Sequence, residues 1–320
     1  MTIVCTGSIA FDYLMTFPGY FREQILIDKL ENISLSFLVD TMIKQRGGVA
    51  PNIAYTLALL GERPAVMGTV GEDFSEYRSW MEAQNIDTSL VKVIDGKFTA
   101  SFFANTDLAN NQISSFYTGA MANAGEIKLR DLHFKADLVV ISPNDPAAMY
   151  QYSLECQELG LPYLFDPGQQ VARNPGDQLR AGVIGAQSLF VNEYEYELLQ
   201  KHTGLSEKQI LEHVKYMVVT CGEKGARVFS GGKQYMIPVV PPAQIADPTG
   251  VGDAFRGGFL RGHNLGFDWD ICGRMGSLAA TYALEQHGTQ NHRYTPAEFV
   301  VRYRQHFDDQ GVLDALLANS

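Results

Sequence analysis

The chain has 320 residues and a formal net charge of −11, with 46% hydrophobic and 19% charged residues. This is the balance of an ordinary globular protein, far from the composition of disordered chains. The acidic total argues against a nucleic-acid partner and weakly against an anionic membrane, but it allows a small anionic ligand because a local field can oppose the global charge.

The N-terminal stretch MTIVCTGSIAF has no basic region, and its apolar run is broken at Thr6 and Gly7, so we expect no secretion signal. No segment approaches the roughly 18 consecutive apolar residues of a membrane span. The four cysteines form no CxxC pair and the seven histidines show no metal-ligand spacing, which predicts free thiols and no zinc site. These features together predict a soluble, cytoplasmic protein.

Short apolar runs alternate with helical patterns along most of the chain. The runs are solidly apolar, as expected of parallel strands buried on both faces, and lie at Ile3–Cys5, Ala65–Val70, Leu138–Ser142, Tyr163–Phe165, Ser188–Val191 and Met217–Thr220. The intervening helices have legible signals: Ala50–Leu60 is followed by Gly61, and another helix begins at Asp145-Pro146 and ends at Gly160. Two further helices open with the capping-box pairs Ser206/Gln209 and Thr295/Glu298. The alternation predicts an α/β fold with a doubly wound, mostly parallel sheet.

Two regions depart from this alternation. Phe98–Ala104 and Gln112–Thr118 alternate with period two around the polar turn Asn105–Asn111, which indicates a β-hairpin. Leu14–Phe17 and Ile33–Leu38 are also strand-like and have no adjoining helix. We therefore expect one α/β domain over residues 1–320, interrupted by a small antiparallel β lid built from about residues 12–40 and 92–118.

The stretch DPTGVGDAF, Asp247–Phe255, carries the clearest chemistry. Gly250 and Gly252 bracket a turn that leads into a helix, whose first amides have no intrahelical partner and attract an anion. Asp253 lies beside these amides, so its carboxylate suits a general base that takes the proton of a hydroxyl attacking a bound phosphoryl group. The alternative is a glycine-rich connection that Asp253 merely caps. No GxxxxGK[ST] motif is present, which excludes a P-loop protein.

These residues resemble the C-terminal signature of the ribokinase-like, or PfkB, family of carbohydrate and nucleoside kinases. GGVAPN at 47–52, NEYE at 192–195 and TCGEKG at 220–225 are similar to three further motifs of the family, in the same order. Within it, GSIAFD at 7–12, SLSFLVD at 34–40, SFY at 115–117 and DPGQQ at 166–170 look like segments of bacterial-type adenosine kinases. Gly168 departs from this pattern, where we would expect a serine.

The resemblance implies a ribose site and a base site. Asp12 would accept hydrogen bonds from the 2′- and 3′-hydroxyls of a ribose, with Gly48 and Asn52 completing the clamp; otherwise Asp12 would be a loop or cap residue. Phe102 and Phe116 would stack on the base, the alternative being simple lid packing. Further polar contacts to the nucleoside are expected from Ser8, Ser36, Gln169 and Gln170. Phe103 and Tyr117 point the other way and suit lid packing or a subunit contact.

The resemblance also implies an ATP site. Its turn would use Thr220, Gly222, Glu223 and Gly225, with Asn192 and Gly252 close to the nucleotide, and Arg173 could neutralise the transferring phosphate. Glu195 would hold Mg²⁺ through water, because Mg²⁺ keeps several waters in such sites; the alternative is a solvated helix carboxylate. Some kinases of this family are activated by a monovalent cation, and no residue pattern here decides that point.

These inferences lead to the hypothesis of an adenosine kinase that transfers the ATP γ-phosphate to the 5′-hydroxyl of adenosine and so serves purine salvage. A kinase acting on a sugar or another nucleoside is the first alternative, and a catalytically silent nucleotide-binding module is the second. The exposed edge of the lid sheet, with the family resemblance, also predicts a homodimer formed through the lid.

Overall fold

The computed structural model describes residues 2–25 and 34–318. A large sheet of nine strands runs through the molecule in the order β13 (Lys233–Ile237), β12 (Ala226–Ser230), β11 (Tyr216–Thr220), β10 (Ser188–Asn192), β9 (Tyr163–Phe165), β8 (Leu138–Ile141), β1 (Ile3–Thr6), β4 (Ala65–Val70) and β5 (Asp87–Val93). All neighbours from β11 to β5 pair in parallel, and only β12 and β13 are antiparallel additions. The six sequence-predicted core strands are confirmed to within one residue at each end.

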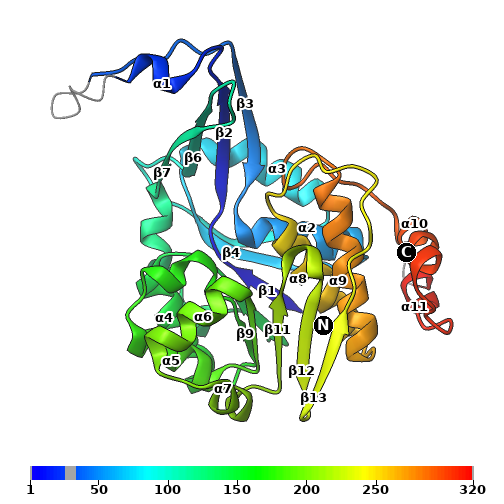
Figure 1. Ribbon diagram of the computed structural model, residues 1–320. Coiled ribbons are helices and arrows are strands. Elements are labelled where there is room, and N and C mark those ends of the chain that lie inside the picture. Colours follow the sequence, from blue (N-terminus) through cyan, green and yellow to red (C-terminus); the bar gives the residue numbers. More distant parts are fainter. Residues whose placement is uncertain (1, 26–33, 319–320) are drawn as a thin grey trace.

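Helices cover both faces of this sheet (Figure 1). One face carries α4 (Pro146–Leu159), α5 (Gly176–Gly185), α6 (Glu193–Thr203) and α7 (Glu207–His213), and the other carries α2 (Val49–Leu59), α3 (Ser75–Ala83), α8 (Val251–Asn264) and α9 (Trp269–Leu284). In β1, Ile3 and Cys5 join one buried apolar cluster and Val4 joins the other. Both faces of the strand are therefore buried, which explains its unbroken apolar run.

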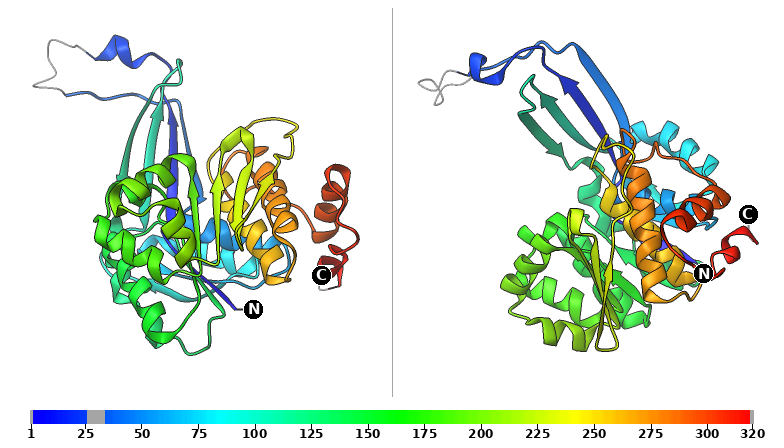
Figure 2. Two further views of the ribbon diagram at one scale, coloured as in Figure 1. Left: turned by 60° about the horizontal axis from the view of Figure 1, so that its bottom comes forward. Right: turned by 45° about the vertical axis from the view of Figure 1, so that its right-hand side comes forward.

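The predicted helix signals are confirmed. Asp145 caps α4, Gly160 ends it in the left-handed region, and α7 and α10 (Pro296–His306) begin with the capping boxes of Ser206 and Thr295. The short helices α1 (Phe21–Gln24) and α11 (Asp314–Leu317) lie at opposite extremes of the molecule (Figure 2). All four cysteines are free. Within the described ranges, no helix is both long and apolar enough to cross a membrane.

A second, four-stranded sheet stands above the carboxyl ends of the parallel strands (Figures 1 and 2). Its order is β3 (Thr41–Gly47), β2 (Ala10–Thr16), β6 (Ala100–Thr106) and β7 (Gln112–Tyr117). The outer pairs are antiparallel as expected, whereas the central pair β2–β6 is parallel. We call this sheet the lid.

Two details of the lid differ from expectation. Residues 34–38 form no strand, and Ile33 lies outside the described residues; the strand partner of β2 is instead Thr41–Gly47. Phe37 packs edge-on against Phe17 and Phe21, which holds its segment at the lid's outer end rather than in the sheet. Strand β6 begins at Ala100 because Asp73 accepts hydrogen bonds from both the amide and the hydroxyl of Thr99.

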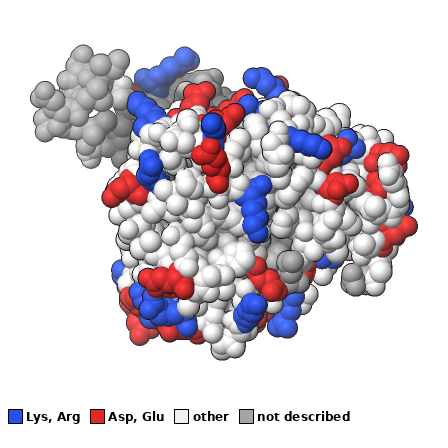
Figure 3. Space-filling model, turned by 90° about the horizontal axis from the view of Figure 1, so that it is seen from below, with Lys and Arg blue, Asp and Glu red and all other residues white. Residues whose placement is uncertain are grey.

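The opposite end of the molecule has no such layer. On the face seen from below in Figure 3, acidic and basic side chains are interspersed around a largely uncharged area. The negative net charge is therefore not collected into one field on this face.

Candidate active site

The start of α8 forms the floor of the candidate site. Gly250 is the N-cap with a φ of 76°, and an added Cβ there would lie 2.9 Å from Cβ of Thr289, so only glycine fits. Among the described residues, the amides of Gly252 and Asp253 have no hydrogen-bond acceptor. Free amides at the positive end of a 14-residue helix suit a phosphoryl group.

Asp253 lies on the first turn of this helix. Its Oδ2 accepts a hydrogen bond from Nδ2 of Asn52 at 2.8 Å, whereas Oδ1 has no partner in the part of the chain that the structure describes. Burial raises the pKa of Asp253 to about 7, although Arg256 and the hydrogen bond from Asn52 oppose the rise. A carboxyl with one free oxygen and a pKa near neutrality is suited to general-base chemistry.

A buried ion pair beside Asp253 was not foreseen from the sequence. Nη2 of Arg256 donates to Oδ1 of Asp166 at 2.8 Å, and these two residues are only 8% and 1% exposed. An added Cβ at Gly252 would lie 2.8 Å from Nη1 of Arg256, which places the guanidinium against the first turn of α8. The spacing of three residues between Asp253 and Arg256 puts both on one helix face, and that signal could have identified the arginine.

The lid and α2 carry the residues that were predicted to bind a ribose. Asp12 lies on β2, and burial together with nearby Asp247 raises its pKa to about 6. Gly48 begins α2 with a φ of 99°, and an added Cβ would lie 2.4 Å from the carbonyl oxygen of Ser8. Oγ of Ser8 accepts a hydrogen bond from the amide of Val49, so Ser8 also fastens the start of α2. The two predicted segments, 7–12 and 47–52, are thus brought together.

One row of side chains crosses the lid on its site-facing side. Gln45, Asp12, Phe102 and Phe116 are directly opposite one another on the four strands β3, β2, β6 and β7. Opposed residues of neighbouring strands share a face of the sheet. Phe102 and Phe116, predicted to stack on the base, therefore lie on the same face as Asp12, predicted to bind the ribose. Phe116 is 44% exposed, and its ring is available to a ligand.

Four other residues were predicted to contact a substrate: Gln169, Gln170, Arg173 and Ser36. Gln170 is buried, and its Nε2 donates to the carbonyl of Asn144 at 2.8 Å, so only its Oε1 remains unpaired; Gln169 is exposed. Arg173 is exposed and has no ion-pair partner among the described residues, in contrast with Arg256. Ser36 is exposed next to Phe37 at the outer end of the lid, and it does not lie in the row of Asp12, Phe102 and Phe116.

Gly168, the departure from the expected serine, has a structural reason. Its φ is 47°, a region that side chains rarely adopt, and an added Cβ would lie 2.4 Å from Cγ of Pro143. The loop that leads from Asp166 into η5 (Gly168–Ala172) therefore requires glycine at this position.

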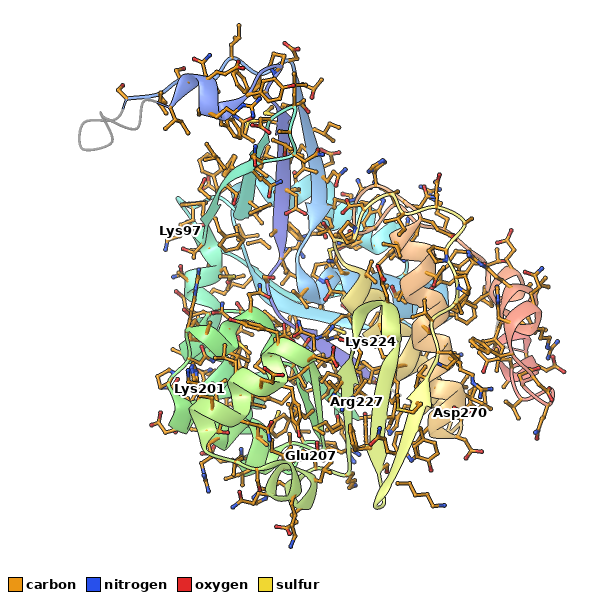
Figure 4. All side chains as sticks on the ribbon, viewed as in Figure 1. Lys97, Lys201, Glu207, Lys224, Arg227 and Asp270 are labelled. Atoms are coloured by element: carbon orange, nitrogen blue, oxygen red, sulfur yellow. The ribbon has the colours of Figure 1, made fainter. Side chains whose placement is uncertain are left out.

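The predicted nucleotide turn lies at the end of β11. The amide of Cys221 donates to the carbonyl of Gly225 at 2.7 Å and closes a short 3₁₀ turn, η6 (Gly222–Lys224). At Gly225, with a φ of 89°, an added Cβ would collide with the carbonyl oxygen of Ile237. Figure 4 shows Lys224 at this turn, at the lid end of the sheet, with Arg227 farther along β12. The turn is thus on the same edge as the start of α8.

Glu195 caps the start of its own helix, α6. Its Oε2 accepts from the amide of Asn192 at 2.8 Å, and Oδ1 of Asn192 accepts from the amide of Glu195 at 2.7 Å, which forms a capping box on α6. The same Asn-x-x-Glu spacing is a helix-start signal. Burial, followed by Asp166, raises the pKa of Glu195, and its Oε1 accepts no hydrogen bond among the described residues. Within the described ranges, no cluster of three or more His, Cys, Asp or Glu residues could hold a metal.

A comparison with family models matches residues 11–296 to the pfkB family carbohydrate kinases. The chain belongs to this PfkB family. The match spans the lid, the row of Asp12 and Phe102, and the start of α8. The ribokinase-like fold follows from the same comparisons, since the chain superimposes with a TM-score of 0.86 on a Methanocaldococcus jannaschii nucleoside kinase of the ribokinase family, 27% identical over 95% of this chain and 98% of that one.

Two nucleoside kinases of other organisms resemble the chain over a similar length. A nucleoside kinase of Methanothermobacter thermautotrophicus is 30% identical, covering 94% of this chain and 95% of its own length. A Burkholderia thailandensis nucleoside kinase solved with inosine is 38% identical with a TM-score of 0.85, covering 96% of this chain and 98% of that one. The same enzyme has also been solved as an ADP-inosine complex, with a TM-score of 0.83.

Proposed function

We propose that this PfkB-family protein is an ATP-dependent nucleoside kinase that phosphorylates the 5′-hydroxyl of adenosine to give AMP and ADP, a step of purine salvage. The observation that carries the proposal is the row of Asp12, Phe102 and Phe116 on the site-facing side of the lid. A carboxylate suited to two ribose hydroxyls lies beside two aromatic rings suited to a purine, above the base Asp253. A sugar would use the carboxylate but has no purine base to stack between the two rings.

The chemistry follows from the start of α8. The 5′-hydroxyl loses its proton to Oδ1 of Asp253 while its oxygen forms a bond to the γ-phosphorus, and the bond to the β-phosphate oxygen breaks to release ADP. The free amides of Gly252 and Asp253 and the guanidinium of Arg256 stabilise the charge of the transferring group. Catalysis of this kind is mostly positioning and electrostatics, and closure of the lid over the nucleoside excludes water.

The donor nucleotide is assigned to the edge between η6 and α8. Thr220, Gly222, Glu223 and Gly225 would contact it along the turn, with Asn192 on the neighbouring strand end. When bound with the triphosphate, Mg²⁺ would neutralise phosphate charge, and Glu195 fits a role in holding one of its waters through Oε1. The capping box fixes the carboxylate in place for that role.

The acceptor can be tested directly. A kinase assay should compare adenosine, inosine, the other common nucleosides, ribose and fructose with Mg-ATP. Inosine belongs in the panel because a relative has been solved with it. The highest kcat/KM is expected for adenosine; preference for ribose or fructose would contradict the nucleoside assignment, and adenosine binding without ADP formation would indicate a silent nucleotide-binding module.

Phe102→Ala is expected to raise the KM for adenosine by about tenfold or more, since stacking on an aromatic ring contributes about 1–3 kcal/mol per base. The measurement is steady-state kinetics with varied nucleoside at saturating ATP. Phe103→Ala is the matched control, because Phe103 is the next residue of β6, points to the opposite face and stacks on Tyr13 at 4.9 Å. Equal effects of the two substitutions would show that the rings only pack the lid.

We also propose that the protein is a homodimer formed through the outer face of the lid. This face, turned away from Asp12, exposes Met42, Phe103, Ile113 and Tyr117 at 63%, 37%, 44% and 45%. Exposed apolar patches of this kind, next to unpaired strand edges, mark association surfaces.

Light scattering should give twice the mass of one chain. Phe103→Asp is expected to shift the mass to that of a monomer, because a charge would be buried in the interface. Met236→Asp, at the far edge strand β13 and 61% exposed, serves as the control and should leave the mass unchanged. A monomeric mass for the unsubstituted protein would contradict the proposal.

A further inference from the structure

A chain of buried hydrogen bonds links the base of the lid to Asp253. The hydroxyl of Tyr77 donates to the carbonyl of Gly47, the last residue of β3, at 3.0 Å. Nε2 of Gln290 donates to the same Tyr77 hydroxyl at 2.6 Å and to Oδ1 of Asn52 at 2.7 Å. Asn52 in turn donates from Nδ2 to Oδ2 of Asp253 at 2.8 Å. Gln290 lies after α9, 37 positions beyond Asp253 in the chain, and no motif of the sequence pointed to it.

The direction of this chain is set at its outer end. A backbone carbonyl can only accept, so Tyr77 must donate to Gly47 and therefore accept from Gln290. This requirement places the nitrogen of the Gln290 amide, not its oxygen, toward Tyr77 and Asn52. Asn52 then meets Gln290 with its oxygen and has only its nitrogen left for Asp253. With the opposite orientation, the Asn52 oxygen would face a carboxylate and repel it.

We propose that Gln290 is a positioning residue that holds the Asn52 amide with its nitrogen toward Asp253. Resting on the proposed kinase function, this role keeps the base ionised near neutrality and leaves its Oδ1 free for the acceptor hydroxyl. Gln290 is 3% exposed and reaches no predicted substrate residue other than through Asn52.

The charged groups around Asp253 do not depend on Gln290. Arg256 on the same helix favours the ionised carboxylate, whereas Asp166 beyond β9 and Glu195 on α6 disfavour it. At the other end of the chain, Arg46 and Asp12 act on Tyr77, and burial lowers the pKa of nearby His292 to about 4, so that imidazole is neutral during turnover. A neutral substitution at Gln290 therefore changes the Asn52 contact without changing these charges.

Two variants of similar size separate positioning from packing. Gln290→Met keeps the shape but cannot donate, and the acid limb of the kcat–pH profile is expected to move up by about one pH unit, with an about fivefold loss of turnover at neutral pH. Gln290→Glu places a carboxylate, an acceptor, opposite Asn52. This carboxylate attracts the Asn52 nitrogen and so turns the Asn52 oxygen toward Asp253, and we expect a larger upward shift of the acid limb. Tyr77→Phe, which removes only the group that orients Gln290, should give a smaller shift in the same direction.

Gln151 provides the matched control. It is half-buried on α4 and donates to the carbonyl of Ile127 at 3.2 Å, far from the start of α8, so Gln151→Met should leave the pH profile unchanged. A ¹³C NMR titration of the Asp253 carboxyl, which needs no turnover, should show the same upward shift in the Gln290 variants. Suppose that the wild-type enzyme is active but that both Gln290 variants keep its acid limb and its Asp253 titration. That result would overturn the positioning role of Gln290 and leave the kinase function standing. An unsubstituted protein that phosphorylates no nucleoside would instead overturn the kinase function.

Discussion

Asp253→Asn is expected to lower kcat by about 10²–10⁴-fold, the usual contribution of a general base, while adenosine binding measured by calorimetry stays within a few fold. The amide has nearly the same shape and can still meet Asn52, but it cannot take the hydroxyl proton. The residues proposed to hold the nucleoside, Asp12, Gly48, Asn52 and Phe102, are all retained in this variant, so binding should persist. Near-normal turnover would contradict the mechanism.

The pH dependence gives a second test of the same residue. Because burial raises the pKa of Asp253 to about 7, the base is ionised above that pH, and kcat should fall as the pH drops through it. Stability changes with pH in the opposite direction to kcat. Above the folded-state pKa of Asp253 its buried charge lowers the free energy of unfolding, and below the ordinary Asp pKa the carboxyl is protonated and this penalty is absent. Asp253→Asn should therefore raise the melting temperature most at alkaline pH, which also shows that the inactive variant is folded.

The parts of the molecule that could be predicted from the sequence are those with local causes. Solid apolar runs identified the core strands because both of their faces are buried, as Ile3 and Val4 show. Gly250 was predicted to lie in a turn that leads into a helix, and its backbone geometry admits no side chain. Period-two alternation likewise placed Phe102 and Phe116 in a hairpin.

Partners distant in sequence could not be predicted in this way. The ISLSFL run alternates like a strand, yet Phe37 is held by Phe17 and Phe21, a contact that no local pattern encodes. The Asp166–Arg256 pair joins residues 90 positions apart, and Gln290 joins Asn52 across 238. Glu195 shows the opposite case: its local capping signal was present in the sequence, but we interpreted the residue as holding Mg²⁺ through water or as a solvated helix carboxylate, and not as a cap.

Arg256→Met is expected to destabilise the protein by about 3–5 kcal/mol, because it leaves the Asp166 carboxylate buried without a partner. Chemical denaturation measures the loss. Burial raises the pKa of Asp166 and Arg256 opposes that rise, so removing the arginine raises the pKa further. The uncompensated charge disappears when Asp166 is protonated, and the loss of stability should therefore be larger at alkaline than at acidic pH. The double variant Arg256→Met/Asp166→Asn should recover most of the lost stability.

Arg261→Met separates this stability effect from catalysis. Arg261 lies on a later turn of α8, away from Asp253, and forms an ion pair with the buried Glu62. Loss of the Arg261 guanidinium should destabilise the fold to a similar degree. Of these two arginines, Arg256 is the one that favours the ionised form of Asp253, so Arg256→Met but not Arg261→Met should move the acid limb of the kcat profile upward. If both variants lose stability but share the wild-type pH profile, Arg256 is a structural cation and the charge of the transferring phosphate is balanced elsewhere. If only Arg256→Met moves the profile, one guanidinium holds Asp166 in the fold and also tunes the base.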